Sequence, residues 1–173
     1  MSFVQWVRVR RMIEEVALEP KQTFWNMNMN LLLDAAIVEW AKVFGSHDTE
    51  DTHWKNVIPA DQHEATRAAL LKHLGLTPEQ WKAEREGMIA YRNQLVSHHD
   101  LEATVAKIPR FDVPLQAAFF MFDRIRAITD QEWLGNIPTA LDSWSKTVAG
   151  NMRVIVCKAH SATKTLPSNV LDN

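Results

Sequence analysis

The segment Tyr91–Asp100, Tyr-Arg-Asn-Gln-Leu-Val-Ser-His-His-Asp, gathers side chains that are suited to phosphoryl transfer. A neutral His can remove a proton from a ribose 2′-hydroxyl, and a protonated His can donate one to the leaving 5′-oxygen. An Arg can stabilise the charge that develops on phosphorus. Arg92, Asn93, His98 and His99 are therefore the candidate catalytic residues. This chemistry predicts RNA cleavage without a metal ion or a cofactor, and it spares DNA, which has no 2′-hydroxyl.

A strong helix-start signal precedes these residues. Thr77 offers a hydroxyl at the N-cap, Pro78 occupies the first helical position, and Gln80 stands at the third. We expect the helix to run from Pro78 to about His99, a length of about 30 Å. The candidate residues then lie at its C-terminal end.

An apolar stripe interrupted by charge is expected along this helix. At about 100° per residue, the stripe contains Trp81, Met88, Ile89, Leu95 and Val96. Arg92 falls within the stripe, and Arg85 and His99 share nearly the same azimuth. His98 lies with Tyr91 at the other margin. The regular helix thus places His99 nearer to Arg92 than His98.

A guanidinium on an apolar face needs a partner, because burying an unpaired charge costs several kcal/mol. It can pair with a carboxylate, line a wet cleft or bind an anionic ligand. In the first case Arg85 or Arg92 would form an ion pair with an acidic residue of another helix, such as Asp34 or Glu39. In the last case Arg85 and Tyr91 join the site as substrate-binding residues.

The pattern of Arg92, Asn93, four further residues and His98 resembles the motif of the HEPN superfamily. That motif is Arg, a polar residue, and His after a total gap of four to six. The whole segment 91–100 is similar to the abortive-infection branch of the superfamily, and residues 44–46 and 52–55 resemble the same branch. The resemblance covers about residues 24–130.

The resemblance implies a helical bundle that dimerises, often with two motif copies in one cleft, and RNA cleavage in antiviral defence or toxin systems. It implies catalytic roles for Arg92 and His98, and an orienting or phosphate-binding role for Asn93. His99 also satisfies the permitted gap, so both imidazoles remain candidates. The implied partners are RNA, a second copy of the chain and an antitoxin or other regulatory protein. The alternative function is a non-catalytic helical dimerisation or interaction module in which Arg92 forms a structural ion pair.

Composition sets further limits. The 173 residues are 46% hydrophobic and carry a formal net charge of −2, so overall charge does not indicate a nucleic-acid binder. RNA contacts would need a local arrangement, such as Arg8, Arg10 and Arg11 or a groove shared by two subunits. Cys157 is the only cysteine, which fits a reducing compartment. The most apolar stretch, 31–44, contains three charged residues, so we expect a soluble cytoplasmic protein without a membrane segment.

The remaining helices are predicted from apolar spacing, caps and prolines. The expected ranges are 3–18, 24–44, 61–75, 112–135 and 136–160. Gly45 is expected to end the second in a left-handed conformation, 46–60 to form an exposed connection, and the tail 161–173 to fray. The sequence predicts one all-α domain over 1–173, an up-and-down bundle of four core helices within about 24–130 plus short or terminal helices.

Two further groups have a functional and a structural interpretation. His47, Asp48, Glu50, Asp51 and His53 are of metal-ligand type, but a solvated loop explains them, and we expect no metal site. Trp40, Trp54, Trp81, Trp133 and Trp144 could stack on bases, but packing in the core is the expectation that we adopt.

Overall fold

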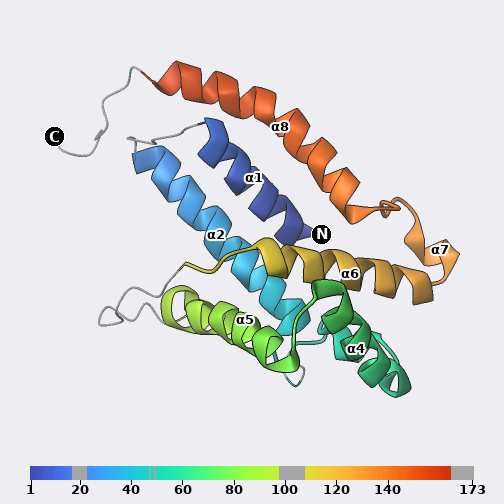
Figure 1. Cartoon of the computed structure of the whole chain (residues 1–173). Coiled ribbons are helices and arrows are strands. Elements are labelled where there is room, and N and C mark those ends of the chain that lie inside the picture. The colour runs from blue at the N-terminus through green and yellow to red at the C-terminus, as the bar shows by residue number, and fades with distance from the viewer. Residues whose placement is uncertain (17–22, 47, 49, 98–107, 165–173) are drawn as a thin grey trace. The chain divides into compact units, whose positions relative to one another are not determined.

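The structure, a computed structural model, describes residues 1–16, 23–46, 48, 50–97 and 108–164. All regular elements in these ranges are helical, which confirms the predicted all-α class (Figure 1). In chain order they are α1 (Ser2–Val16), α2 (Thr23–Phe44), α3 (Trp54–Val57), the 3₁₀ turn η1 (Ala60–Gln62), α4 (His63–Leu74), α5 (Pro78–Tyr91), the π-helix η2 (Arg92–Ser97), α6 (Asp112–Ile128), α7 (Gln131–Leu134) and α8 (Leu141–Thr163).

The chain groups into two compact units. Unit 1 consists of Met1–Ala36 and Asp142–Asn173, and unit 2 consists of Ile37–Leu141. Helix α2 therefore contributes its first residues to unit 1 and its last residues to unit 2. The single domain over 1–173, its up-and-down arrangement and its dimeric state stay predictions.

Unit 1 has a core of its own. Figure 1 shows α1 beside the first part of α2 and beside α8. The buried cluster contains Val9, Met12, Ile13, Trp25 and Val156. Trp25 also donates its indole N–H to Thr163 Oγ1 over 3.1 Å, which ties α2 to the end of α8. The helices expected at the two termini of the chain therefore pack together with the first part of α2.

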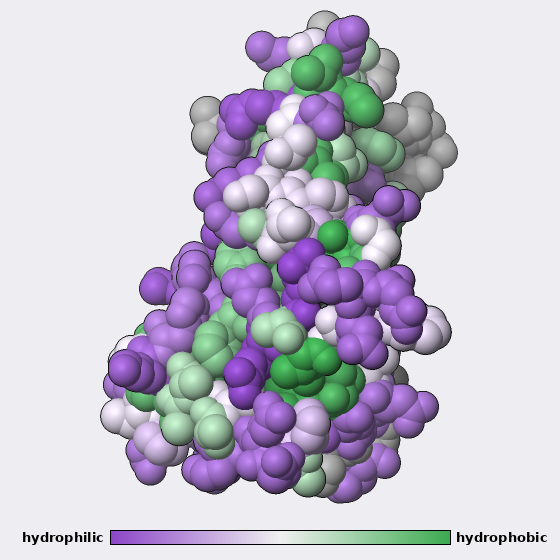
Figure 2. Space-filling model, turned by 90° about the vertical axis from the view of Figure 1, so that its right-hand side faces the viewer, coloured by the Kyte–Doolittle hydropathy of each residue, from purple (hydrophilic) through white to green (hydrophobic). Residues whose placement is uncertain are grey.

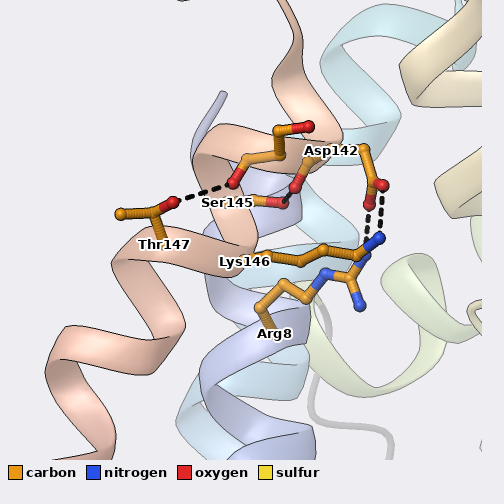
Figure 3. Close-up of polar contacts among 6 residues, drawn as sticks. Arg8, Asp142, Ser145, Lys146 and Thr147 are labelled. Atoms are coloured by element: carbon orange, nitrogen blue, oxygen red, sulfur yellow. Dashed lines mark hydrogen bonds and ion pairs between the residues drawn. The ribbon is translucent and has the colours of Figure 1, made fainter.

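Ion pairs join α1 to α8 in the same unit. Arg8 donates to Asp142 over 2.5 Å, and Lys146 donates to the other oxygen of that carboxylate over 2.6 Å (Figure 3). Arg10 pairs with Glu14 over 2.6 Å. Two of the three arginines considered as a local RNA contact are thus engaged by carboxylates.

The core of unit 2 is formed by the last part of α2 together with α4, α5 and α6. Its buried residues include Ile37, Trp40, Phe44, Leu70, Met88, Leu115 and Met121. Trp40 stacks on Phe44 with ring centroids 4.9 Å apart, and Trp81 of α5 meets both rings edge-on. Arg124 of α6 donates to Gln62 over 3.0 Å. The ring contacts hold α5, which precedes the candidate motif, against α2, and the Arg124 hydrogen bond joins α6 to η1.

The expected left-handed cap at Gly45 is wrong. Among the described glycines only Gly75 and Gly135 have positive φ. Gly45 instead continues the helical backbone far enough for its N–H to reach Ala41 O over 2.8 Å. A Cβ at Gly45 would lie 2.3 Å from that carbonyl oxygen, so glycine is required here by close approach and not by handedness.

The expected exposed connection over 46–60 is wrong in its second half. His53 and Trp54 are 4% and 8% exposed, and Ile58 is 2% exposed. His53 caps α3, because its Nδ1 accepts the Lys55 backbone N–H over 3.2 Å. The polar composition of the segment hid a short helix whose first residue, Trp54, packs inward, whereas Val57 at its other end is exposed.

Two helix boundaries differ from the expected ones. Asp61 does not start α4, because it lies in the 3₁₀ turn after Pro59, and α4 begins at His63. The helix expected over 112–135 is broken at Thr129, whose extended backbone separates α6 from α7. The Thr129 hydroxyl donates to Ile125 O over 2.8 Å, in competition with the helical backbone bonds.

The C-terminal helix also differs from its expected bounds. Helix α8 begins at Leu141 and not at Asn136, because Pro138 disfavours helical backbone at the residue before it. It continues through Thr163, past the expected start of the frayed tail at Ser161, and residues 165–173 lie outside the described part. The expected end of α4 at Gly75 is confirmed, and Gly75 has a left-handed conformation there with a φ of 64°.

Figure 2 shows one face of the molecule, on which hydrophobic side chains surface in separate patches between hydrophilic ones. Within the described residues, no helix combines the length and the apolar character that crossing a membrane requires.

Candidate functional site

The start of α5 is built as the sequence predicts. Thr77 Oγ1 accepts the Gln80 backbone N–H over 3.3 Å, and Gln80 Oε1 accepts the Thr77 backbone N–H over 2.9 Å. This capping box, with Pro78 at the first helical position, fixes where the helix begins. The positions of Arg85 and Arg92 along the helix axis follow from this starting point.

The α-helical winding stops at the candidate motif. Helix α5 ends at Tyr91, and Arg92–Ser97 form a π-helix, in which each backbone bond spans five residues. A π-helix turns through fewer degrees per residue than an α-helix. The placement of His99 at the azimuth of Arg92 assumed uninterrupted α-helix, so that geometric reason for preferring His99 is wrong. His98 and His99 lie outside the described residues, and the choice between them stays open.

Arg92 is half-buried and is held by its neighbour in sequence. Its Nε and Nη2 donate to Asn93 Oδ1 over 3.1 and 2.9 Å. No described carboxylate forms an ion pair with Arg92, and Glu39 pairs with Lys42 over 2.5 Å instead. The intrachain ion pair considered for Arg92 is therefore not formed with Glu39, and the guanidinium keeps N–H groups that are not engaged by Asn93.

Arg85 contacts backbone carbonyls. Its Nε donates to Phe44 O over 2.6 Å and its Nη2 to Gly45 O over 2.8 Å. The last carbonyls of a helix have no partner within it, and Arg85 supplies one to the end of α2. This contact replaces the ion pair with Asp34 or Glu39 that was considered for Arg85. It also explains how α2 ends without a left-handed glycine.

Tyr91, the other candidate for substrate binding, is 7% exposed and belongs to the core of unit 2, beside the 1% exposed Met88. Core packing is confirmed for Trp40 and Trp54, which are 1% and 8% exposed. It is wrong for Trp133, which is 74% exposed in the short helix α7.

A pocket of about 350 Å³ lies in unit 2, and the sequence did not indicate it. Its cationic lining residues are Lys55, Arg67, Lys82 and Arg85, and its aromatic ones are Phe44, Trp54 and Trp81. The interpretation of 46–60 as a solvated loop concealed that His53 and Trp54 turn inward.

No protein-family model, curated protein or solved structure matches this chain. The HEPN superfamily therefore remains a resemblance carried by Arg92, Asn93 and His98.

The described residues of the loop that are of metal-ligand type, Asp48, Glu50, Asp51 and His53, form no metal site. In the parts of the chain that are described, no three His, Cys, Asp or Glu side chains come together as a metal site. His53 of that set is buried and uses Nδ1 to cap α3, and His47 lies outside the described residues. The described groups that could act on a ligand are thus the Arg92–Asn93 pair and the cations of the pocket.

Proposed function

We propose that this chain is a metal-independent endoribonuclease of the HEPN type that acts in antiviral defence or in a toxin system. Arg92 stabilises the phosphoryl transition state, and His98 or His99 moves the protons. The observation that supports this most is the Arg92 guanidinium, which is half-buried, oriented by Asn93 and without a carboxylate partner among the described residues.

An arginine in this state is suited to a phosphate. The guanidinium has five N–H donors in a rigid fork, and Asn93 engages only Nε and Nη2. The donors left over can bind two phosphate oxygens, as guanidinium groups do in bidentate pairs. Because the side chain is already oriented, little reorganisation is needed when charge develops on phosphorus. The π-helix supports the same proposal, because such turns occur frequently at functional sites.

A homodimer belongs to the proposal. A second copy of the chain would bring a second imidazole as acid or base to the same phosphate, with the site at or near the dimer interface. An antitoxin or another regulatory protein would then act by covering this site. RNA is the substrate, because the reaction uses the 2′-hydroxyl as nucleophile.

The test is cleavage of labelled RNA and of DNA of the same sequence in EDTA. We expect RNA to be cut and DNA to stay intact. Arg92→Ala should lower the rate by about 10²- to 10³-fold, as removal of a transition-state donor does. His98→Ala and His99→Ala identify the catalytic imidazole. Arg110→Ala is the matched control, because Arg110 is an exposed arginine of unit 2 outside the motif.

Undiminished cleavage in Arg92→Ala, His98→Ala and His99→Ala would contradict the proposal. Cleavage that disappears when EDTA is added would also contradict it. The alternative, a non-catalytic interaction module, predicts a different outcome. If Arg92 forms a structural ion pair across a dimer interface, Arg92→Ala should cost about 3 to 5 kcal/mol of stability. A catalytic Arg92 can be removed with little change in melting temperature.

A further inference from the structure

The pocket of unit 2 lies where the end of α2, the short helix α3, α4 and the first half of α5 meet. Its volume of about 350 Å³ is within the range of small-molecule sites. Arg92, two helical turns beyond Arg85, is not among its lining residues. The pocket is therefore a place of its own, apart from the motif proposed for RNA cleavage.

The lining of the pocket carries positive charge that no described acidic lining residue neutralises. Lys55, Arg67, Lys82 and Arg85 line it, and no described Asp or Glu does. Neither Lys55 nor Arg67 takes part in an ion pair within the described residues. Lys82 has only an exposed contact with Glu86 at 3.7 Å, of the kind that contributes little. The pocket thus attracts anions.

Two backbone carbonyls hold the Arg85 side chain in position before a ligand binds. The carbonyls of Phe44 and Gly45 engage its Nε and Nη2, at 2.6 and 2.8 Å, and Nη1 takes part in neither bond. The side chain is fixed before any ligand arrives, so little conformational entropy is lost when a ligand binds. The first turn of α5, with Pro78 in the lining, adds the positive end of a helix dipole, and Lys82 lines the pocket from the next turn.

Aromatic rings complete the lining. Phe44, Trp54 and Trp81 all contribute to it. Trp81 is half-exposed, and its edge-on contacts with Trp40 and Phe44, at centroid distances of 6.2 and 5.7 Å, fix the plane of its ring. Flat rings with arginines and lysines around them bind planar aromatic groups by stacking.

Thr66 of α4 gives an independent indication of a ligand. It lines the pocket, it is 1% exposed, and its hydroxyl has no hydrogen-bond partner among the described residues. A buried hydroxyl without a partner destabilises the folded protein. A polar group of a bound molecule would satisfy it.

We propose that this pocket binds a small phosphate monoester that carries a flat aromatic ring. A phosphate monoester has a charge of about −1.5 to −2 at neutral pH, so it can use two or more of the four cations, whereas a carboxylate has a single charge. The ring stacks on Trp81 or Trp54. The proposal does not depend on RNA cleavage.

Isothermal titration calorimetry of the full chain tests it, with phenyl phosphate and 5′-AMP as probes. Inorganic phosphate lacks the ring and adenosine lacks the charge, so each isolates one half of the recognition. We expect at least one of the two esters to bind at least tenfold more tightly than either inorganic phosphate or adenosine. Tighter binding of 5′-AMP than of phenyl phosphate identifies a nucleotide ligand, and the reverse order a smaller aryl ester.

Variants locate the binding. Lys55→Gln and Arg67→Gln should each weaken the ester about tenfold, the loss expected for one charge-assisted contact. Lys72→Gln is the matched control, an exposed lysine of α4 outside the lining, and it should leave the dissociation constant unchanged. Thr66→Val should weaken binding without lowering the melting temperature, because it removes an unsatisfied hydroxyl.

Binding that is unaffected by both Lys55→Gln and Arg67→Gln overturns the proposal. Binding of inorganic phosphate as tight as that of the esters also overturns it, because the ring then contributes nothing. Arg92→Ala should leave ester binding unchanged. Ester binding that is lost in Lys55→Gln and Arg67→Gln while the parent protein cleaves no RNA contradicts the RNA-cleavage proposal alone, and RNA cleavage without ester binding by the parent protein contradicts the pocket proposal alone.

Discussion

The Arg92 guanidinium is held by the side-chain amide of Asn93 and not by a carboxylate of another helix. Asn93 is exposed and accepts two hydrogen bonds from the guanidinium. An amide orients the cation and leaves its charge intact, whereas a carboxylate would neutralise it. This difference is what makes the Arg92–Asn93 pair suited to an anionic substrate.

The positioning role proposed for Asn93 gives a prediction. Asn93→Ala should lower RNA cleavage by about 10- to 100-fold, less than Arg92→Ala, because the arginine remains but is no longer oriented. Asn93→Asp should lower the apparent affinity for RNA, because the new carboxylate pairs with Arg92 and repels phosphate. Steady-state kinetics on a short RNA separate the two effects.

The control is the next amide along the chain. Gln94 is exposed and does not share the hydrogen bonds that join Arg92 to Asn93, so Gln94→Ala should cleave RNA like the parent protein. None of these variants should change the melting temperature noticeably, because exposed substitutions usually stay within about 0.5 kcal/mol. Equal loss of activity in Asn93→Ala and Gln94→Ala would contradict a specific role for Asn93.

Among the helices, α5 supplies hydrogen-bond donors to the carbonyls at the end of α2. Gly45 lets the backbone approach Ala41 O, and Arg85 of α5 binds the last two carbonyls. Helix α2 is thereby fastened to the middle of α5 without a left-handed cap. The same contact forms one wall of the pocket.

Gly45→Ala should lower the free energy of unfolding by about 1 to 3 kcal/mol, the usual cost of overpacking, because the new Cβ would lie 2.3 Å from a backbone oxygen. Urea unfolding followed by circular dichroism measures it. Gly87→Ala is the control within α5, where no atom lies within 4 Å of the new Cβ. There alanine should stabilise the helix by about 0.5 to 1 kcal/mol. Equal effects of the two substitutions would show that close approach at Gly45 is unimportant.

In the molecule as a whole, α1 and α8 of unit 1 are joined by contacts between residues more than 130 positions apart. Asp142 at the start of α8 binds Arg8 of α1, and Arg153 of α8 binds Glu15 of α1 over 2.9 Å. The pKa of Asp142 is lowered, first by its hydrogen bond with Lys146 and further by the charges of Lys146 and Arg8. Burial acts in the opposite direction without cancelling these effects.

This lowered pKa makes unit 1 sensitive to acid. A carboxylate whose pKa falls on folding stabilises the folded state above its ordinary pKa of 3.8, and this contribution is lost as pH falls through the folded pKa. Asp142→Asn should therefore melt about 1 to 3 °C lower than the parent at pH 7, the effect of a partly exposed ion pair. The difference should disappear on acidification to well below pH 3.8.

Asp130→Asn serves as the comparison, because Asp130 is exposed and its side chain does not cap α7. Differential scanning fluorimetry from pH 7 to pH 2.5 should show no pH-dependent gap between this variant and the parent. A gap for Asp142→Asn that stays constant down to the lowest pH would contradict the role assigned to the ion pair.

Helix boundaries that depend on local signals could be predicted from the amino-acid sequence. Thr77, Pro78 and Gln80 specify the start of α5, and Gly75 specifies the end of α4, because a cap depends on residues within one turn. Apolar spacing of three and four specifies α1 and α2 to within two residues at each described end. Arg92 and Asn93 were predicted as site residues from residue type and spacing, and their roles stay predictions.

The partners of Arg85 and the pocket could not be predicted, because they depend on contacts between distant segments. Arg85 finds its partners 40 and 41 residues away, and the cations of the pocket come from three helices. The inward turn of His53 and Trp54 depends on packing against other segments, and no local pattern indicated the π-helix at Arg92. A helix cap stabilises itself within a few residues, whereas a pocket exists only after distant segments have folded against one another.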